Sequence, residues 1–138
     1  GGVERDNPFL RQLNKLSNVY LPGPRPATEV PDWLYRCQVL IDLQRTDQPF
    51  DDVVSPRLYE YLATGKPVVS MMWPDQVELF PDVVYGAHDL EEFVILCEHA
   101  LEEDPHFVSR RRMDRAAEAA WPQRVGEVER ILTTAGLL

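Results

Sequence analysis

Apolar residues along the chain follow two patterns, and these predict separate strands and helices. Short, nearly continuous apolar runs are typical of strands covered on both faces of a parallel sheet. Four segments have this character: 19–23 (VYLPG), 38–43 (QVLIDL), 67–72 (PVVSMM) and 83–87 (VVYGA). We therefore expect four strands.

Between these runs, apolar residues recur every three or four positions, which is the spacing of a buried helix face. The predicted helices follow Asn7, Thr28, Ser55 and Asp89, and prolines 105 and 122 divide the helical last third of the chain. Alternating strands and helices predict an α/β fold, a Rossmann-like parallel sheet with helices on both faces. Because Gly1 and Gly2 have no strand before them, we expect the first strand or strands of the sheet to be missing.

Composition and charge favour a globular domain and argue against a nucleic-acid-binding or membrane-spanning protein. The chain has 138 residues, 44% of them hydrophobic, which suits a single domain spanning 1–138. The net charge of −9 argues against nucleic-acid binding, which needs a basic surface. No apolar run approaches the roughly 18 residues of a membrane span, and the chain begins without a signal-peptide pattern. We expect a cytoplasmic protein.

Three further groups of residues offer little chemistry. The arginine run 110–112 lies in a helical pattern and is interpreted as a solvated or lipid-facing face. Cys37 and Cys97 fall on predicted apolar helix faces, so we expect two buried free thiols. The three histidines form no metal-ligand spacing with either cysteine.

The segment SPRLYEYLATGKPVVS, 55–70, carries the strongest functional pattern. Ser55 and Pro56 suit the start of a helix that follows a buried strand and a polar loop. In a parallel sheet, ligands bind at the carboxyl ends of the strands. Arg57 and the helix N-terminus could hold a phosphate there, and Glu60 could accept hydrogen bonds from ribose hydroxyls. The alternative is a surface ion pair between Arg57 and Glu60.

This segment resembles the donor-nucleotide segment of GT-B glycosyltransferases, which often contain Pro-x-Lys-Leu-Tyr-Glu-Tyr-x-Ala-x-Gly-Lys-Pro-Val-Val. The flanks support the resemblance: 18–44 is similar to a strand, helix and strand of that family, and 117–124, which ends in W-x-x-R, is similar to part of its C-terminal helices. The resemblance thus covers nearly the whole chain. It implies the C-terminal, donor-binding domain of a larger two-domain enzyme.

The resemblance also implies roles for single residues. Glu60 matches the glutamate that holds the nucleotide ribose, and Arg57 matches the basic residue that contacts the diphosphate. Ser55 and Pro56 lie where the helix N-terminus faces that diphosphate. Asp52 stands where many members have a glutamate that touches the donor sugar, so this contact differs here. The resemblance identifies no catalytic residue in this chain.

The implied function is transfer of a hexosyl group from a nucleoside-diphosphate sugar, such as a UDP-sugar, to a polysaccharide or glycolipid. The resemblance implies no metal and no cofactor besides the donor. The implied partners are the nucleotide sugar and an N-terminal acceptor domain, without which this chain alone is expected to be inactive. Peripheral association with the inner face of the membrane is left open.

Two alternatives remain open from the sequence. A nucleotide-sugar 2-epimerase uses a similar two-domain frame, although its histidine and carboxylate pattern is not evident here. A non-catalytic α/β interaction module would need no nucleotide at all. Binding of UDP or GDP separates both enzymes from the module.

Overall fold

The computed structural model of the chain describes residues 7–43, 54–71 and 74–137. Contacts divide the chain into two compact units, Gly1–Trp33 and Leu34–Leu138, and each is described by itself. The family-derived prediction of one domain within a larger enzyme stays a prediction.

The first unit is mostly helix and irregular chain. It contains α1 (Pro8–Leu13), the short 3-10 helix η1 (Ala27–Glu29) and the start of α2 (Val30–Arg36). The predicted cap of α1 is confirmed, since the Asn7 side chain accepts a hydrogen bond from the Phe9 amide at 2.9 Å. The strand predicted at 19–23 is wrong: this part of the chain is irregular and pairs with no strand among the described residues.

The second unit contains the sheet. Its strands are β1 (Leu40–Asp42), β2 (Val68–Met71) and β3 (Tyr85–Ala87), parallel and in the order β1-β2-β3. These are three of the four predicted strands, each shorter than its apolar run. Asp42 lies opposite Ser70 in the register of β1 and β2, so both residues stand at the carboxyl edge of the sheet.

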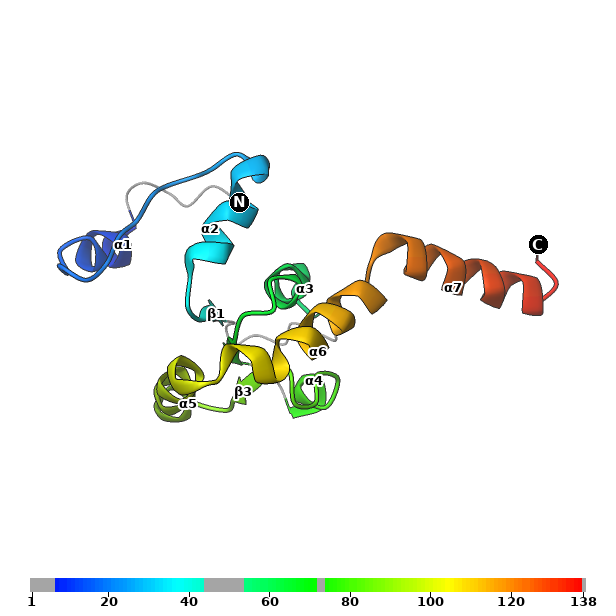
Figure 1. Ribbon diagram of the computed structural model, residues 1–138. Helices are drawn as coiled ribbons and strands as arrows, with labels where there is room; N and C mark the ends of the chain where they lie inside the picture. Colours follow the sequence, from blue (N-terminus) through cyan, green and yellow to red (C-terminus); the bar gives the residue numbers. More distant parts are fainter. Residues whose placement is uncertain (1–6, 44–53, 72–73, 138) are drawn as a thin grey trace. The chain divides into compact units, whose positions relative to one another are not determined.

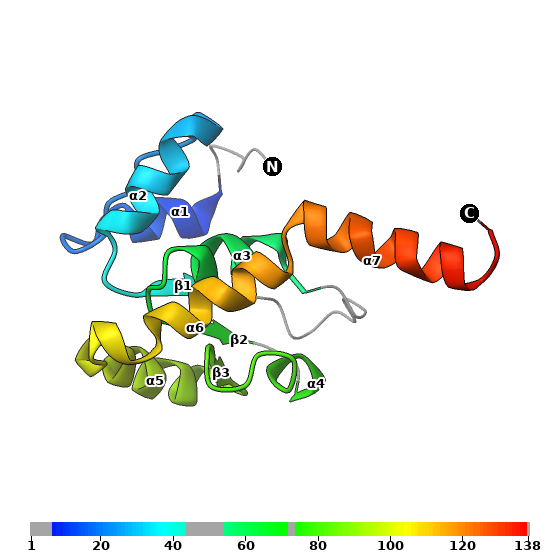
Figure 2. The same cartoon turned by 45° about the vertical axis from the view of Figure 1, so that its right-hand side comes forward.

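Helices cover both faces of this sheet, as Figures 1 and 2 show. On one face lie α3 (Pro56–Ala63) and α6 (Pro105–Glu118), which pack against each other. On the other face α5 (Leu90–Glu102) packs against β2 and β3. Two further helices are α4 (Pro74–Val77) and α7 (Trp121–Thr134). The predicted α/β, Rossmann-like architecture is confirmed.

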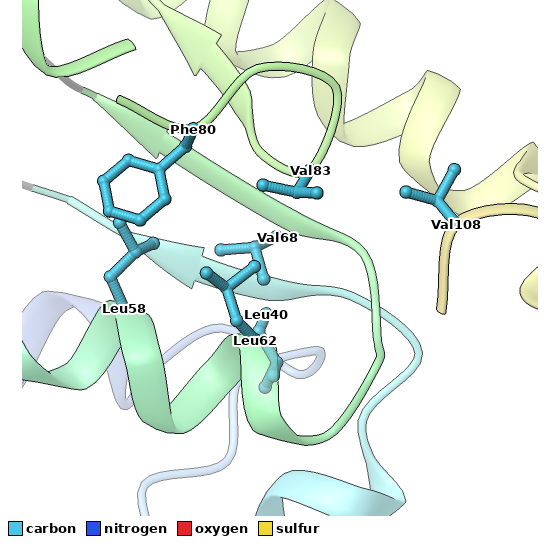
Figure 3. Packing of buried hydrophobic residues seen from close by; sticks show 7 residues of the cluster. All are labelled: Leu40, Leu58, Leu62, Val68, Phe80, Val83 and Val108. Atoms are coloured by element: carbon cyan, nitrogen blue, oxygen red, sulfur yellow. The ribbon is translucent and has the colours of Figure 1, made fainter. Parts of the chain in front are cut away.

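Each face of the sheet has its own apolar core, because successive residues of a strand point to opposite faces. Val68 belongs to the core under α3 and α6, and Val69 belongs to the core under α5. Figure 3 shows the first core, in which Leu58 and Leu62 of α3 point toward the strands. Its buried members are Leu40, Leu58, Leu62, Val68, Phe80, Val83 and Val108.

Gly65 ends α3, as the sequence predicts, and also permits its close approach to α6. Its φ of 72° lies in the left-handed region that glycine adopts without strain. A Cβ atom at this position would collide with the side chain of Ser109 on α6. The α3–α6 packing therefore requires glycine here.

A buried ion pair ties α6 to the end of α5 and to β3. The Arg112 guanidinium, 1% exposed, donates to both carboxylate oxygens of Glu103 at 2.6 and 2.7 Å and to the Val83 carbonyl at 2.9 Å. The Tyr85 hydroxyl donates to Glu103 at 2.7 Å. The interpretation of 110–112 as a solvated or lipid-facing face is therefore wrong for Arg112, while Arg110 and Arg111 are exposed and pair with Asp114 and Asp82.

The Glu103 carboxylate is charged in this setting. Burial opposes its ionisation, but the hydrogen bonds from Arg112 and Tyr85 and the nearby guanidinium outweigh burial and lower the pKa of Glu103. Because the pKa is lower in the folded chain, this stabilisation is present at neutral pH. It is lost as the pH falls below the ordinary value of 4.5 and through the folded-state pKa.

We predict that Glu103→Gln lowers the free energy of unfolding by about 3 kcal/mol at pH 7, because Arg112 stays buried without its counter-charge. The matched control is Asp114→Asn, which removes the exposed ion pair with Arg110 on α6, the helix of Arg112, and should cost less than about 1 kcal/mol. Urea unfolding from pH 7 to pH 3 measures both, and the loss from Glu103→Gln should shrink at the acid end. Equal losses in the two variants would contradict the role of the buried pair.

Candidate functional site

The candidate site lies where β1 ends and α3 begins, at the carboxyl edge of the sheet. The apolar side chains of α3 lie on β1 and β2, which fixes the position of its first turn. Ser55, Pro56 and Arg57 occupy that turn. Asp52, the residue predicted to face the donor sugar, lies outside the described residues.

Ser55 is the N-cap residue of α3, as predicted, but its hydroxyl makes no capping hydrogen bond to the first-turn amides. Instead its Oγ accepts a hydrogen bond from Arg57 Nε at 3.4 Å. Pro56 follows at the first helical position, where its missing N–H costs nothing. The Leu58 amide donates instead to the Ser55 backbone carbonyl at 2.9 Å.

Arg57 pairs with Asp42 of β1 rather than with Glu60. Arg57 Nη2 lies 3.6 Å from Asp42 Oδ1, and the arginine side chain is 63% exposed whereas the aspartate is 1% exposed. The predicted alternative, a surface ion pair between Arg57 and Glu60, is not formed in the described part of the chain. A cation in the first turn of a helix opposes the helix dipole, and the buried carboxylate offsets that cost.

Asp42 itself is held firmly by the sheet. It lies in register with Ser70, whose hydroxyl donates to the Asp42 backbone carbonyl at 3.2 Å. Both side chains are buried. Asp42 therefore has a fixed position beside an exposed guanidinium.

Glu60 lies one turn further along α3 and is exposed. Within the described part of the chain, no hydrogen bond or ion pair is found for its carboxylate. It stands on the polar side of α3, opposite the buried Leu58 and Leu62. This arrangement leaves the carboxylate accessible to hydroxyl groups of a ligand.

Tyr61 lies near the charged groups of the site, although the sequence assigned it no role. Burial raises the pKa of its phenol, and the Arg57 guanidinium acts in the opposite direction. The Asp42 and Glu60 carboxylates raise that pKa further. Tyr61 is half-buried and packs against the core under α3.

The sequence pattern alone does not identify Asp42 as a site residue, because it falls inside a predicted strand. The signal was present, because one aspartate interrupts the apolar run VLIDL. A carboxylate in a buried strand needs a partner, and the nearest arginine after the loop was Arg57.

Other predicted features can now be compared with the structure. Cys37 is exposed, so its predicted burial is wrong, and Cys97 is half-buried. In the described ranges no three side chains of histidine, cysteine, aspartate or glutamate gather closely enough to hold a metal ion. None of the described helices combines the length and apolarity that crossing a membrane requires. The predicted absence of a metal stays a prediction.

Comparison with known proteins identifies the family. The model of the family described as "Glycosyl transferase-like" matches residues 5–128. The chain belongs to this family. With its parallel sheet it is a glycosyltransferase domain of the GT-B type. This favours the predicted glycosyltransferase over the 2-epimerase and the non-catalytic module.

A curated relative supports the assignment. The chain is 31% identical over 100 residues to the Bacillus subtilis (strain 168) protein named "Putative teichuronic acid biosynthesis glycosyltransferase TuaH". The match covers 69% of this chain and 25% of the relative, so the chain spans about a quarter of that protein's length. No solved structure matches the chain significantly.

We predict that Arg57→Ala lowers the free energy of unfolding by about 1 kcal/mol, because it removes the guanidinium beside a buried carboxylate. Asp42→Asn should cost less stability in the Arg57→Ala background than in the wild type, because part of its effect runs through the pair. Urea unfolding of both single variants and the double variant measures this coupling, with Glu60→Ala as the control that changes little. Equal costs of Asp42→Asn in the two backgrounds would contradict the assigned ion pair.

Proposed function

We propose that this chain is the donor-binding domain of a glycosyltransferase that uses a nucleoside-diphosphate sugar. The observation that carries the proposal is the arrangement at the start of α3. An exposed guanidinium lies at the N-terminus of α3, and an accessible carboxylate follows one turn later. A cation at a helix N-terminus suits a diphosphate, and a carboxylate can accept hydrogen bonds from the hydroxyls of the adjacent ribose.

Each predicted residue then has a distinct part in holding the donor. Arg57 and the first-turn amides of α3, beside Ser55 and Pro56, bind the diphosphate. Glu60 accepts hydrogen bonds from the ribose hydroxyls. Asp52 contacts the transferred sugar, a role that rests on the family resemblance alone.

The same groups assist the reaction itself. When the glycosidic bond breaks, negative charge builds on the leaving nucleoside diphosphate. The Arg57 guanidinium and the α3 amides stabilise that charge more in the transition state than in the bound donor. We propose that this is done without a metal ion, because a cation and helix amides already face the diphosphate.

For the acceptor, the partners and the cellular location we propose only general classes. The relative's name refers to teichuronic acid biosynthesis, which supports a hexosyltransferase whose acceptor is a polysaccharide or a glycolipid. The remaining partners are then a nucleotide sugar, such as a UDP-sugar, and an N-terminal acceptor domain of the same protein. We propose a cytoplasmic location, at the inner face of the membrane if the acceptor is a lipid, and no turnover by this chain alone.

We predict that Glu60→Ala weakens binding of UDP or GDP by about tenfold, the loss expected for a hydrogen bond to a charged group. Its stability should stay close to that of the wild type, because Glu60 is exposed. Isothermal calorimetry with each nucleotide measures the affinity, and thermal melting measures the fold. The control is Glu98→Ala, which removes an exposed glutamate on α5. Equal affinity in the two variants, or early melting of Glu60→Ala, would contradict the ribose role.

A further inference from the structure

Asp42 is a buried charged group at the donor site that the predicted site residues do not include. Its carboxylate is 1% exposed and lies at the carboxyl end of β1. Its backbone is fixed by pairing with β2 and by the Ser70 hydroxyl. A buried side chain on a paired strand has one position, so it is a rigid anchor for whatever binds it.

Arg57 is the group that this anchor holds. Its side chain is long and mostly exposed, and an unrestrained arginine of this kind samples many rotamers. Nη2 lies 3.6 Å from Asp42 Oδ1, an ion-pair contact longer than a hydrogen bond, and Nε donates to the Ser55 hydroxyl at 3.4 Å. One contact comes from the strand and the other from the helix N-cap, so together they favour one placement of the planar group over its other rotamers.

The remaining nitrogen is available to a ligand. Over the described residues, Nη1 of Arg57 has no hydrogen-bond or ion-pair partner, and it carries two N–H donors. Because the guanidinium is planar, fixing two of its nitrogens also fixes the direction of the third. The exposed side of the group therefore presents aimed donors rather than a mobile charge.

We propose that Asp42 is a positioning residue of the donor site, which holds the Arg57 guanidinium in its diphosphate-binding position before the donor arrives. This inference rests on the proposed function. The benefit is preorganisation, since a side chain already fixed loses little conformational entropy when the ligand binds. Removing the Asp42 carboxylate should therefore weaken diphosphate binding and leave the affinity for the nucleoside unchanged.

The Asp42 carboxylate would also repel the diphosphate. Repulsion alone predicts that Asp42→Asn tightens diphosphate binding, whereas loss of Arg57 positioning predicts that it weakens binding. The ligand would approach from the exposed side of the guanidinium, with the cation between the two anions. Repulsion across that distance is screened by solvent on the exposed side. Fixing the cation should therefore outweigh the repulsion.

The test is a double-mutant cycle on the full chain with wild type, Asp42→Asn, Arg57→Ala and the double variant. Asparagine keeps the volume of aspartate and removes its charge. Calorimetry gives the affinities for UDP and GDP, and ligand-observed NMR gives those for uridine and guanosine. Circular dichroism at the binding temperature confirms that each variant is folded.

We expect Asp42→Asn to weaken diphosphate binding about fivefold, the equivalent of immobilising one long side chain, and to leave nucleoside binding unchanged. In the Arg57→Ala background, Asp42→Asn should have no further effect on binding. Unchanged or tighter diphosphate binding by Asp42→Asn, equal losses for diphosphate and nucleoside, or additive losses in the double variant would overturn the positioning role. Failure of the wild type to bind either nucleotide would overturn the proposed function, and the positioning role with it.

Discussion

The candidate site depends on how α3 packs on the sheet. Leu58 and Leu62 are fully buried against Leu40 and Val68, and this contact fixes the helix on the strands by burial of apolar surface. Its first turn then stands at the carboxyl edge, where Arg57 reaches the end of β1. Had the helix shifted by one turn, Arg57 would no longer lie beside Asp42. The apolar side of α3 thus determines where its polar side presents charge.

Charge at this edge follows from the same packing. Arginine in a first helical turn and aspartate inside a strand each break a local rule, since the first opposes the helix dipole and the second buries a carboxylate. Together the two residues offset each other's cost. Such paired exceptions are expected at functional sites rather than in purely structural segments. The pair of Arg112 with Glu103 differs because both partners are enclosed and no donor faces the solvent, which is the pattern of a structural link.

Much of the fold could be predicted from the sequence, and the failures have physical causes. The caps Asn7 and Asp89 and the glycine that ends α3 were predictable because short-range geometry alone determines them. The segment 19–23 failed because an apolar run says nothing about whether a neighbouring strand exists to pair with it. In the candidate site, Ser55, Pro56, Arg57 and Glu60 are predicted from spacing and family resemblance, and their binding roles stay predictions. Asp42 was missed because its partner is separated from it by a loop, and the pairing of Arg112 with Glu103 likewise depends on tertiary contact.

We propose above all that the start of α3 binds a nucleoside diphosphate. An NMR titration of the isotope-labelled chain with UDP and with GDP tests this most directly. The account predicts that the amides of Arg57 and Leu58 and the guanidinium Nε of Arg57 shift first and most, while those of α7 do not move. Shifts confined to other elements, or none at saturating nucleotide, would contradict it.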